Sequence, residues 1–460
     1  MDQSIQFDLD LIQRYDKSGP RYTSYPTALE LHEGFGEAEY RRQIELSNAN
    51  GGPLSLYFHI PFCDTVCFFC ACNKIITKNR AHAVPYLDSL IQEIAMQGAL
   101  FDPGRVVNQL HWGGGTPTFL NPGQMQALMQ ATRRHFTLRD DDQGEYSIEV
   151  DPRETNENTV AQLRELGFNR ISLGLQDFDP AVQKAVNRLQ SAEQTFAVLE
   201  AARREGFRST NVDLIYGLPK QTEDTFAATL DQVLAHAPER FSIFNYAHMP
   251  ARFKTQRQIV DAELPSAAQK LEILQMIGRK LTAAGYVYIG MDHFAQPDDK
   301  LAVAQREGKL YRNFQGYSTH SDCDLIGLGM TAIGRVADAY IQNLKELDEY
   351  NQAIAAGRLP VFRGVTLDAD DKLRRAVITQ LICHFELGFA SIEQAFNINF
   401  ADYFAAELEQ LQDMQQDGLL TLSPQGIQVT SAGRLLIRNI CMTFDKYLAQ
   451  KQKQQFSRVI

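Results

Sequence analysis

The chain has 460 residues, of which 44% are hydrophobic and 22% are charged, a balance that excludes a disordered or collagen-like protein. This length indicates one large domain with a smaller companion. A formal net charge of −11 argues against a general binder of nucleic acid or anionic membranes. Seven cysteines are too few for a disulfide scaffold of this size. With no apolar run of about 18 residues and no signal-peptide pattern, we expect a cytoplasmic enzyme.

Runs typical of β-strands alternate with amphipathic stretches along the first 290 residues. The predicted strands lie at 54–60, 107–112, 146–150, 170–175, 211–216, 240–247 and, less distinctly, 286–290, and the helical patterns at 86–100, 124–136, 160–166, 192–205 and 223–235. This alternation predicts parallel βαβ units with right-handed crossovers. Six or seven units favour a full or partial (β/α) barrel, whose reactive groups lie on the loops after the strands.

After residue 367 the pattern becomes mainly helical, with predicted helices at 370–385, 392–415 and 432–451 and a short hairpin within 418–430. Helices followed by a small hairpin are typical of a winged-helix unit. The segment carries no dense basic face, so a structural or lid role is favoured over DNA binding. We therefore predict an N-terminal extension over the active site (1–50), a barrel domain (51–366) and a helical, winged-helix-like domain (367–460).

Four cysteines gather in a ten-residue stretch directly after the first predicted strand: Cys63, Cys67, Cys70 and Cys72. Thiolates at i, i+4 and i+7 can converge on one inorganic centre. Structural zinc normally takes four ligands, often from two C-x2-C pairs, whereas three cysteines would leave one iron of a 4Fe–4S cluster open. Cys72 could supply a fourth ligand. The spacing favours an iron–sulfur cluster, and zinc or metal-free thiols are the alternatives.

The other three cysteines, Cys323, Cys383 and Cys441, stand alone in apolar or helical contexts. We expect them to behave as small buried hydrophobic residues.

A run of glycines, Gly113 to Gly115, follows the second predicted strand and leads into Thr116 and Pro117. Glycine lets a backbone approach a ligand closely because it has no Cβ. Taken alone, this run also fits a plain strand-to-helix turn. Its place one strand after the cysteine loop indicates a cofactor-binding turn.

The motif Cys63-x3-Cys67-x2-Cys70, with Phe69 before the third cysteine, resembles the signature of the radical S-adenosylmethionine (SAM) superfamily. The resemblance implies that these cysteines hold a 4Fe–4S cluster whose open iron chelates the amino and carboxylate groups of SAM. The glycine run then resembles the family's glycine motif. The implied fold is α/β, a partial (β/α)6-type barrel.

Other stretches resemble the branch of this superfamily that decarboxylates porphyrinogens. They lie at 19–27, 57–63, 70–74, 147–153, 211–219, 290–295, 313–317 and 456–460. The resemblance implies conversion of two propionate side chains of coproporphyrinogen III to vinyl groups, giving protoporphyrinogen IX, while SAM is cleaved to methionine and 5′-deoxyadenosine. It also implies a small electron-donor protein such as flavodoxin or ferredoxin as partner, and a monomer without nucleic-acid or membrane partners.

The family's binding residues carry over by position. Tyr57, Gly114, Glu149 and Ile333 would contact the cluster-bound SAM, and Phe69, Gly115, Thr116, Gln176, Arg188, Asp213 and Ala247 a second SAM. Structural alternatives exist: Tyr57 and Phe69 could be core aromatics, Glu149 could cap a helix, and Arg188 could be a solvated surface charge.

The N-terminal stretch 19–27 contains two prolines and cannot form a regular helix. We expect it to run extended to the barrel mouth, with Arg21 near a substrate propionate.

Two other functions remain open. A haem chaperone of the same superfamily keeps the three-cysteine loop but, as a family, lacks the 19–27 stretch and a cysteine at the place of Cys72, and carries a His-Asn-x-x-Tyr-Trp motif. This chain has the 19–27 stretch and Cys72. Its single tryptophan, Trp112, lies beside the glycines instead of in such a motif. These differences favour the decarboxylating enzyme. A zinc-binding structural protein is the second alternative, which metal analysis would separate.

Overall fold

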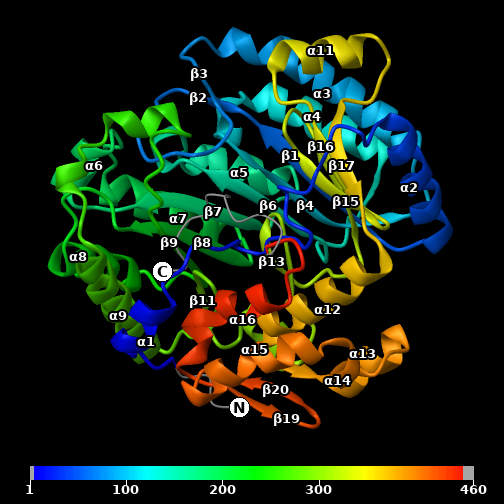
Figure 1. Ribbon diagram of the computed structural model, residues 1–460. Coiled ribbons are helices and arrows are strands. Elements are labelled where there is room, and N and C mark those ends of the chain that lie inside the picture. The colour runs from blue at the N-terminus through cyan, green and yellow to red at the C-terminus, as the bar shows by residue number, and fades with distance from the viewer. Residues whose placement is uncertain (1–4, 449–460) are drawn as a thin grey trace.

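The computed structural model describes residues 5–448 and is organised by one large mixed sheet (Figure 1). Its central strands are β1 (Leu54–Ile60), β4 (Val106–Gly114), β6 (Glu145–Val150), β7 (Arg170–Gln176), β8 (Ser209–Tyr216) and β9 (Arg240–Asn245). They are parallel and neighbour one another in chain order. The predicted partial barrel of six βα units is therefore confirmed, with strand ends shifted by at most two residues.

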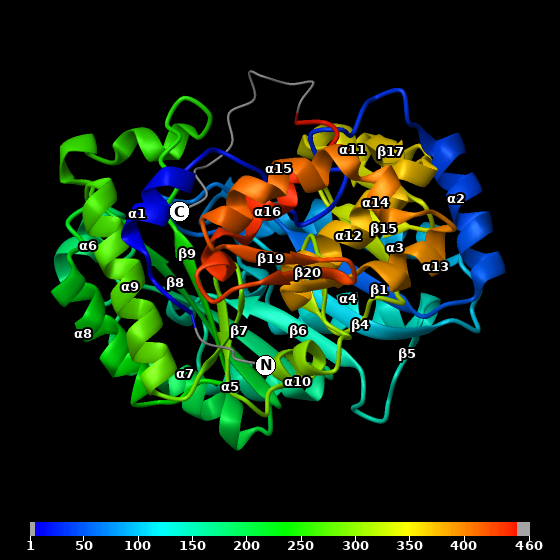
Figure 2. The ribbon, with the colours of Figure 1, turned by 60° about the horizontal axis from the view of Figure 1, so that its bottom comes forward.

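Helices cover the outer face of this sheet (Figures 1 and 2). They are α3 (Ala83–Gly98), α4 (Pro122–His135), α5 (Glu157–Glu165), α6 (Pro180–Ala185), α7 (Ala192–Arg204), α8 (Glu223–Leu234) and α9 (Ala267–Ala283). Side chains that accept a hydrogen bond from the first turn fix where several of them begin, as Ser191 does for α7, Thr222 for α8 and Ser266 for α9.

The sheet continues past β1 in a part of the chain where no strands were predicted. Here β14 (Asp324–Leu328) runs parallel to β1, and β15 (Ile333–Val336), β16 (Ala339–Asn343) and β17 (Val361–Thr366) follow in antiparallel order. These strands have four to six residues, too few for a clear hydrophobic period. At the opposite edge, β11 (His293–Ala295) is antiparallel to both β9 and β10 (Val287–Gly290).

Shorter elements complete the barrel domain. They are β2 (Phe62–Cys63), β3 (Ile75–Ile76), β5 (Thr137–Leu138), α10 (Lys300–Arg306), α11 (Leu347–Ala355) and the hairpin of β12 (Tyr311–Asn313) and β13 (Gly316–Ser318).

The N-terminal part contains α1 (Leu9–Tyr15) and α2 (Glu37–Asn50), separated by a segment without a helix at 19–27. Tyr22 and Tyr25 in this segment are buried, and the Tyr22 hydroxyl donates a hydrogen bond to Asp445 at 2.9 Å. The segment packs against the C-terminal helices and, in agreement with its prolines, forms no helix at 19–27. The extended path predicted for it is wrong, because Tyr22 adopts a left-handed conformation (φ 45°) and the chain bends at 23–26.

The C-terminal part contains α12 (Ala369–His384), α13 (Phe389–Phe396), α14 (Phe400–Tyr403), α15 (Ala405–Gln416), α16 (Ile437–Thr443) and a three-stranded antiparallel sheet of β18 (Glu386–Gly388), β19 (Leu420–Ser423) and β20 (Gly426–Val429). Figure 2 shows this unit beside one end of the barrel.

Two helix predictions in this part are wrong. The single helix expected at 392–415 is divided, because Asn397 adopts a left-handed conformation (φ 53°) and Asn399 caps a new helix. The helix expected at 432–451 ends at Thr443, and its last three predicted residues lie outside the described residues, as does the matching stretch 456–460.

Within residues 5–448, no helix combines the length and the apolar character that crossing a bilayer requires.

A buried carboxyl group joins α3 to the turn after β14. Glu93 is fully buried and accepts hydrogen bonds from the Gly329 N–H and the Tyr350 hydroxyl, both at 2.7 Å, and from Asn343 Nδ2 at 2.8 Å. Two turns earlier on α3, the Tyr86 hydroxyl donates to the carbonyl oxygen of His59 near the end of β1. These contacts from α3 therefore stabilise the end of β1, the strand that leads into the cysteine loop.

Burial raises the pKa of Glu93 from 4.5 to about 7, although its hydrogen bonds oppose the shift. Folding thus favours the protonated carboxyl, and this contribution to stability is present below pH 4.5 and lost as the pH rises through 7. Glutamine stays neutral throughout. We expect the difference in Tm between wild type and Glu93→Gln to fall between pH 5 and pH 8 in anaerobic thermal scans. The exposed Glu45→Gln is the control, and a constant difference for Glu93→Gln would contradict the assignment.

Candidate functional site

The cysteine loop is closed on itself and anchored to its neighbours. It leaves β1 and returns to β3, which pairs with β2, and the Thr77 N–H donates to the Cys63 carbonyl at 3.0 Å. Within the loop the Cys70 N–H donates to the Cys67 carbonyl at 3.2 Å, and the Phe68 N–H donates to the Val186 carbonyl at 3.0 Å. These bonds direct Cys63, Cys67 and Cys70 toward one cavity.

Cationic and hydroxyl groups surround the cysteine sulfurs. Arg188 Nη1 lies 3.5 Å and Arg153 Nη2 3.7 Å from Cys67 Sγ. The carboxylate of Asp151 pairs with both arginines, at 3.0 and 2.6 Å. Thr116 Oγ1 lies 3.5 Å from Cys63 Sγ. Such donors stabilise thiolates, which are the form that binds metal.

The sulfur positions fit a cluster better than a single ion. Among the described residues, no three of the loop cysteines bring their sulfurs within 4.8 Å of one another. Zinc, with Zn–S distances of about 2.3 Å, would hold its sulfurs about 3.8 Å apart. A 4Fe–4S cluster is larger and takes cysteine ligands. The residues present therefore suit the cluster, held by Cys63, Cys67 and Cys70.

Cys72 also lines the cavity. The neighbouring Cys72 side chain and the charge of Lys74 lower the pKa of Cys70 to about 6, against the opposing effect of burial.

The glycine run is required by packing against the cysteine loop. Gly114 has φ +109°, and a Cβ there would lie 2.5 Å from the His59 ring. A Cβ on Gly115 would lie 2.7 Å from the Pro61 backbone. The Gly115 N–H donates to the Ile60 carbonyl at 2.8 Å. The glycines therefore hold the ends of β1 and β4 in close contact, so that both loops border one cavity.

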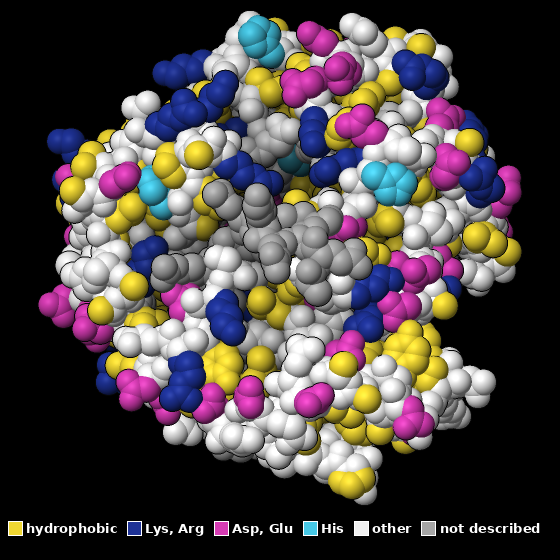
Figure 3. All heavy atoms as spheres, viewed as in Figure 1, with side chains coloured by type: hydrophobic (Ala, Val, Ile, Leu, Met, Phe, Trp, Pro, Cys, Tyr) yellow, Lys and Arg dark blue, Asp and Glu magenta, His cyan; other side chains and the backbone are white. Residues whose placement is uncertain are grey.

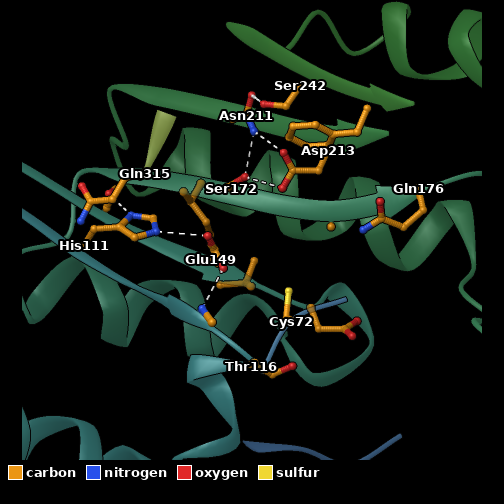
Figure 4. A pocket seen from close by; sticks show the side chains of 18 of the residues that line it. Cys72, His111, Thr116, Glu149, Ser172, Gln176, Asn211, Asp213, Ser242 and Gln315 are labelled. Atoms are coloured by element: carbon orange, nitrogen blue, oxygen red, sulfur yellow. Dashed lines mark hydrogen bonds and ion pairs between the residues drawn. The ribbon is translucent and has the colours of Figure 1, made fainter. Parts of the chain in front are cut away.

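That cavity, of about 460 Å³, extends from the cysteine loop into the barrel (Figure 4). Glu149 accepts a hydrogen bond from the Gly114 N–H at 3.1 Å and lies 3.2 Å from His111 Nε2. Burial raises the pKa of Glu149, but the bonds from His111 and Gly114 outweigh it and hold the pKa below its usual value. Glu149 is therefore an ionised carboxylate beside the glycine run.

Asp213 faces the same cavity from β8. It accepts hydrogen bonds from Ser172 Oγ at 2.9 Å and Asn211 Nδ2 at 2.8 Å. Burial and the nearby charge of Glu149 raise the pKa of Asp213 to about 6. The two carboxyl groups thus differ in acidity because of their surroundings.

Most of the predicted site residues meet in this cavity. Those in its wall are Cys63, Cys67, Phe69, Cys70, Gly114, Gly115, Thr116, Glu149, Gln176, Arg188 and Asp213. Arg188 is 7% exposed and Glu149 caps no helix, so the structural alternatives for these two are wrong.

Three predicted residues lie elsewhere. Tyr57 stacks on His111 with ring centroids 5.8 Å apart, one layer behind the wall. Ile333 begins β15, and its backbone packs against Gly327, the residue paired with Tyr57. Ala247 lines a second cavity of about 670 Å³, bordered by the N-terminal segment, β9 and α16.

Several residues of the wall were not found from the sequence. They are mostly polar side chains at every second strand position, such as Gln109 and His111, Ser147, Ser172, Asn211, Arg240 and Ser242. A period of two places them on the inner face of the barrel. The alternation of polar and apolar residues in these strands could have identified the inner positions, but the strands were predicted only as β-strands, without assigning their two faces.

Comparisons with known proteins agree with this geometry. The sequence model of the radical SAM superfamily matches residues 57–233, and that of the HemN C-terminal domain matches residues 367–436. An oxygen-independent coproporphyrinogen III oxidase of Pseudomonas aeruginosa is 56% identical over 99% of both chains, and one of Escherichia coli is 55% identical over 100% of this chain and 99% of its own.

A solved structure agrees as well. The coproporphyrinogen III oxidase (HemN) of Escherichia coli, described as a radical SAM enzyme, matches with a TM-score of 0.93 and 53% identity, over 97% of this chain and 100% of its own.

The barrel, its cysteine loop and these matches define a radical SAM protein, which uses a 4Fe–4S cluster and SAM. More narrowly, the chain belongs to the family of oxygen-independent coproporphyrinogen III oxidases. The haem-chaperone alternative is not supported.

Replacing any of Cys63, Cys67 or Cys70 with serine is expected to remove the iron–sulfur absorption from anaerobically prepared protein, because each sulfur faces the shared cavity. Serine at the buried Cys323, Cys383 or Cys441 is expected to leave the iron and sulfide content unchanged, which provides the control. Stoichiometric zinc in place of iron in the wild type would contradict the assignment.

Cys72→Ser is expected to keep the full iron and sulfide load while activity falls. Cys72 lies two residues past Cys70 and lines the same cavity, and this short separation gives it an awkward reach to the same cluster, so we expect it beside the cluster ligands rather than among them. Iron and sulfide analysis with an activity assay tests this. Loss of the cluster would instead indicate ligation by four cysteines.

Proposed function

We propose that this chain catalyses the anaerobic oxidative decarboxylation of two propionate side chains of coproporphyrinogen III, which gives protoporphyrinogen IX. The observation that carries the proposal is the convergence of three cysteines, the glycine run and Glu149 on one enclosed cavity, in a chain more than half identical throughout its length to oxidases of this name. A cluster-bound SAM supplies, on one-electron reduction, the 5′-deoxyadenosyl radical that removes a hydrogen atom from a propionate.

The chain's own residues position the reactants. Cys63, Cys67 and Cys70 hold the cluster, and Gly114 and Glu149, in the cavity wall, contact the SAM on it. Tyr57 and Ile333 lie behind the wall, so their contact with this SAM has less support. The ionised Glu149 carboxylate suits an ammonium or ribose hydroxyl group, which is supported by its place beside Gly114. Arg188 and Arg153 bring positive charge to Cys67 Sγ, which favours uptake of an electron by the cluster.

The second SAM is a separate proposal. Phe69, Gly115, Thr116, Gln176, Arg188 and Asp213 line the main cavity together, which supports a common ligand. Ala247 lies in the neighbouring cavity, so its contact with that ligand has less support.

Regions outside the barrel enclose the substrate. We assign this role to residues 1–50; in the described part of the chain, residues 367–448 of the helical domain 367–460 pack against residues 5–50. In support, Arg21 forms an ion pair with Asp292 next to β11. Figure 3 shows a hollow in the upper middle of the molecular face, bordered by Lys and Arg side chains, which suits a substrate with four carboxylates.

The enzyme acts as a cytoplasmic monomer that receives electrons from a small protein such as a flavodoxin or a ferredoxin. Among the described residues, no helix is both long enough and apolar enough to cross a membrane.

The test is anaerobic turnover of coproporphyrinogen III with SAM and a chemical reductant, with products identified by mass. We expect loss of two carboxyl groups per molecule and formation of 5′-deoxyadenosine and methionine. The matched control is Cys63→Ser, which cannot hold the complete cluster. Cleavage of SAM without vinyl formation in the wild type would contradict the assigned substrate.

A further inference from the structure

An arginine lies against each end of a row of three rings in the wall of the main cavity. Phe244, His293 and Tyr317 line this cavity, Arg21 borders the neighbouring one, and Arg312 lies over the Tyr317 ring outside the lining of both. The rings of Phe244 and His293 lie edge to face with centroids 6.0 Å apart, and those of His293 and Tyr317 do so at 5.3 Å. The guanidinium of Arg21 lies 5.8 Å from the Phe244 centroid, and that of Arg312 lies 4.6 Å from the Tyr317 centroid.

Arg312 is buried without a counter-charge. It is paired with Tyr317 across the β12–β13 hairpin, so both side chains lie on one face. Its residue is 6% exposed, and Nε and Nη1 have no hydrogen-bond partner among residues 5–448. Among residues 5–448, no carboxylate lies within ion-pair distance of the Arg312 guanidinium. A buried unpaired guanidinium is costly unless a ligand provides the missing charge.

The groups around Arg312 leave the region positive. Asp292 pairs with Arg21, and Arg438 donates to the carbonyl oxygens of Gly19 and Pro20. Burial and the charges of Arg438 and Arg312 lower the pKa of Arg21 to about 10. Burial and the charges of Arg312, Arg21 and Arg240 lower the pKa of His293 well below its usual value. His293 is therefore neutral, and its Nδ1 is buried without a partner.

We propose that Arg312 and Arg21, with His293 between them, form the subsite that binds carboxylate groups of the porphyrinogen substrate. The inference rests on the proposed function and identifies the residues that recognise the substrate's charge. A guanidinium donates two parallel hydrogen bonds to a carboxylate, and a neutral imidazole donates one. The row of rings between the two arginines offers apolar surface to the macrocycle that joins the propionates.

Because SAM also carries a carboxylate, the experiment separates the two sources. Full-length, cluster-loaded protein is titrated anaerobically with coproporphyrin III, the non-reacting oxidised form with four propionates, and with its uncharged tetra-amide, by porphyrin fluorescence. SAM binding is measured separately by equilibrium dialysis. The variants are Arg312→Gln and Arg312→Lys, and the control is Arg306→Gln on the exposed end of α10.

We expect Arg312→Gln to weaken binding of coproporphyrin III by about tenfold or more, the loss typical of one charge-assisted hydrogen bond. Arg312→Lys is expected to restore part of the affinity because it keeps the charge. The tetra-amide should bind equally to wild type and variant, and SAM binding should be unchanged. Arg306→Gln should behave as wild type throughout.

Three outcomes would overturn the subsite. Equal weakening of the acid and the amide would mean that Arg312 only shapes the cavity, unchanged binding of both would mean that it does not contact the ligand, and weakened SAM binding alone would assign the carboxylate to SAM. If Arg312→Gln does not fold, the ratio of acid to amide affinity in Arg312→Lys and Arg21→Gln decides the question.

The proposed function fails on a different result. If the wild type binds coproporphyrin III through Arg312 but forms no vinyl groups, the proposed enzymatic function is contradicted and the proposed subsite is not. A wild type that forms vinyl groups yet binds acid and amide alike contradicts the subsite alone.

Discussion

The site depends on the close contact between the ends of β1 and β4. Gly114 and Gly115 pack so tightly against His59 and Pro61 that a side chain at either glycine would collide with them. This contact brings the cysteine loop of one strand and the glycine turn of the next to the same cavity, and it leaves the Gly114 N–H directed at Glu149. The parallel sheet makes the arrangement possible, because carboxyl ends of parallel strands meet at one edge. The buried Glu93 and Tyr86 support the same strand end from its other side.

The barrel interior is polar because of a regular alternation along its strands. Buried parallel strands are usually apolar on both faces, yet the inner positions here carry Ser172, Asn211 and Ser242 with their carboxyl neighbour Asp213. The outer positions between them, such as Leu173 and Val212, are apolar and buried under the helices. An interior of this kind provides hydrogen bonds for a polar cofactor while the surrounding shell excludes water. The same environment lowers the pKa of Glu149 and raises the pKa of Asp213.

Much of this could be predicted from the sequence because the signals were local. Strand-helix alternation predicted the six parallel strands, and the places of the cysteine and glycine runs directly after strands predicted that their loops would meet. Most of what failed depended on contacts between distant residues, and the break at Asn397 on one local backbone conformation. The strands β14 to β17 are short and are stabilised by pairing with β1 and with one another. The break at Asn397 depends on a single left-handed residue. His111 was missed because its role arises from Tyr57 and Glu149, which lie on two other strands.

The surroundings of the cavity show why a barrel alone is insufficient for a highly charged substrate. Arg21 comes from the N-terminal segment, Arg312 from the β12–β13 hairpin and Arg438 from α16, and the three come together only when all parts of the chain are folded. Mutual repulsion opposes this assembly. Tyr22 and Asp445 offset part of the repulsion by joining the N-terminal segment to the C-terminal helices through a buried hydrogen bond. A substrate with several carboxylates would offset more of it, so its binding would stabilise the packing of these segments against one another.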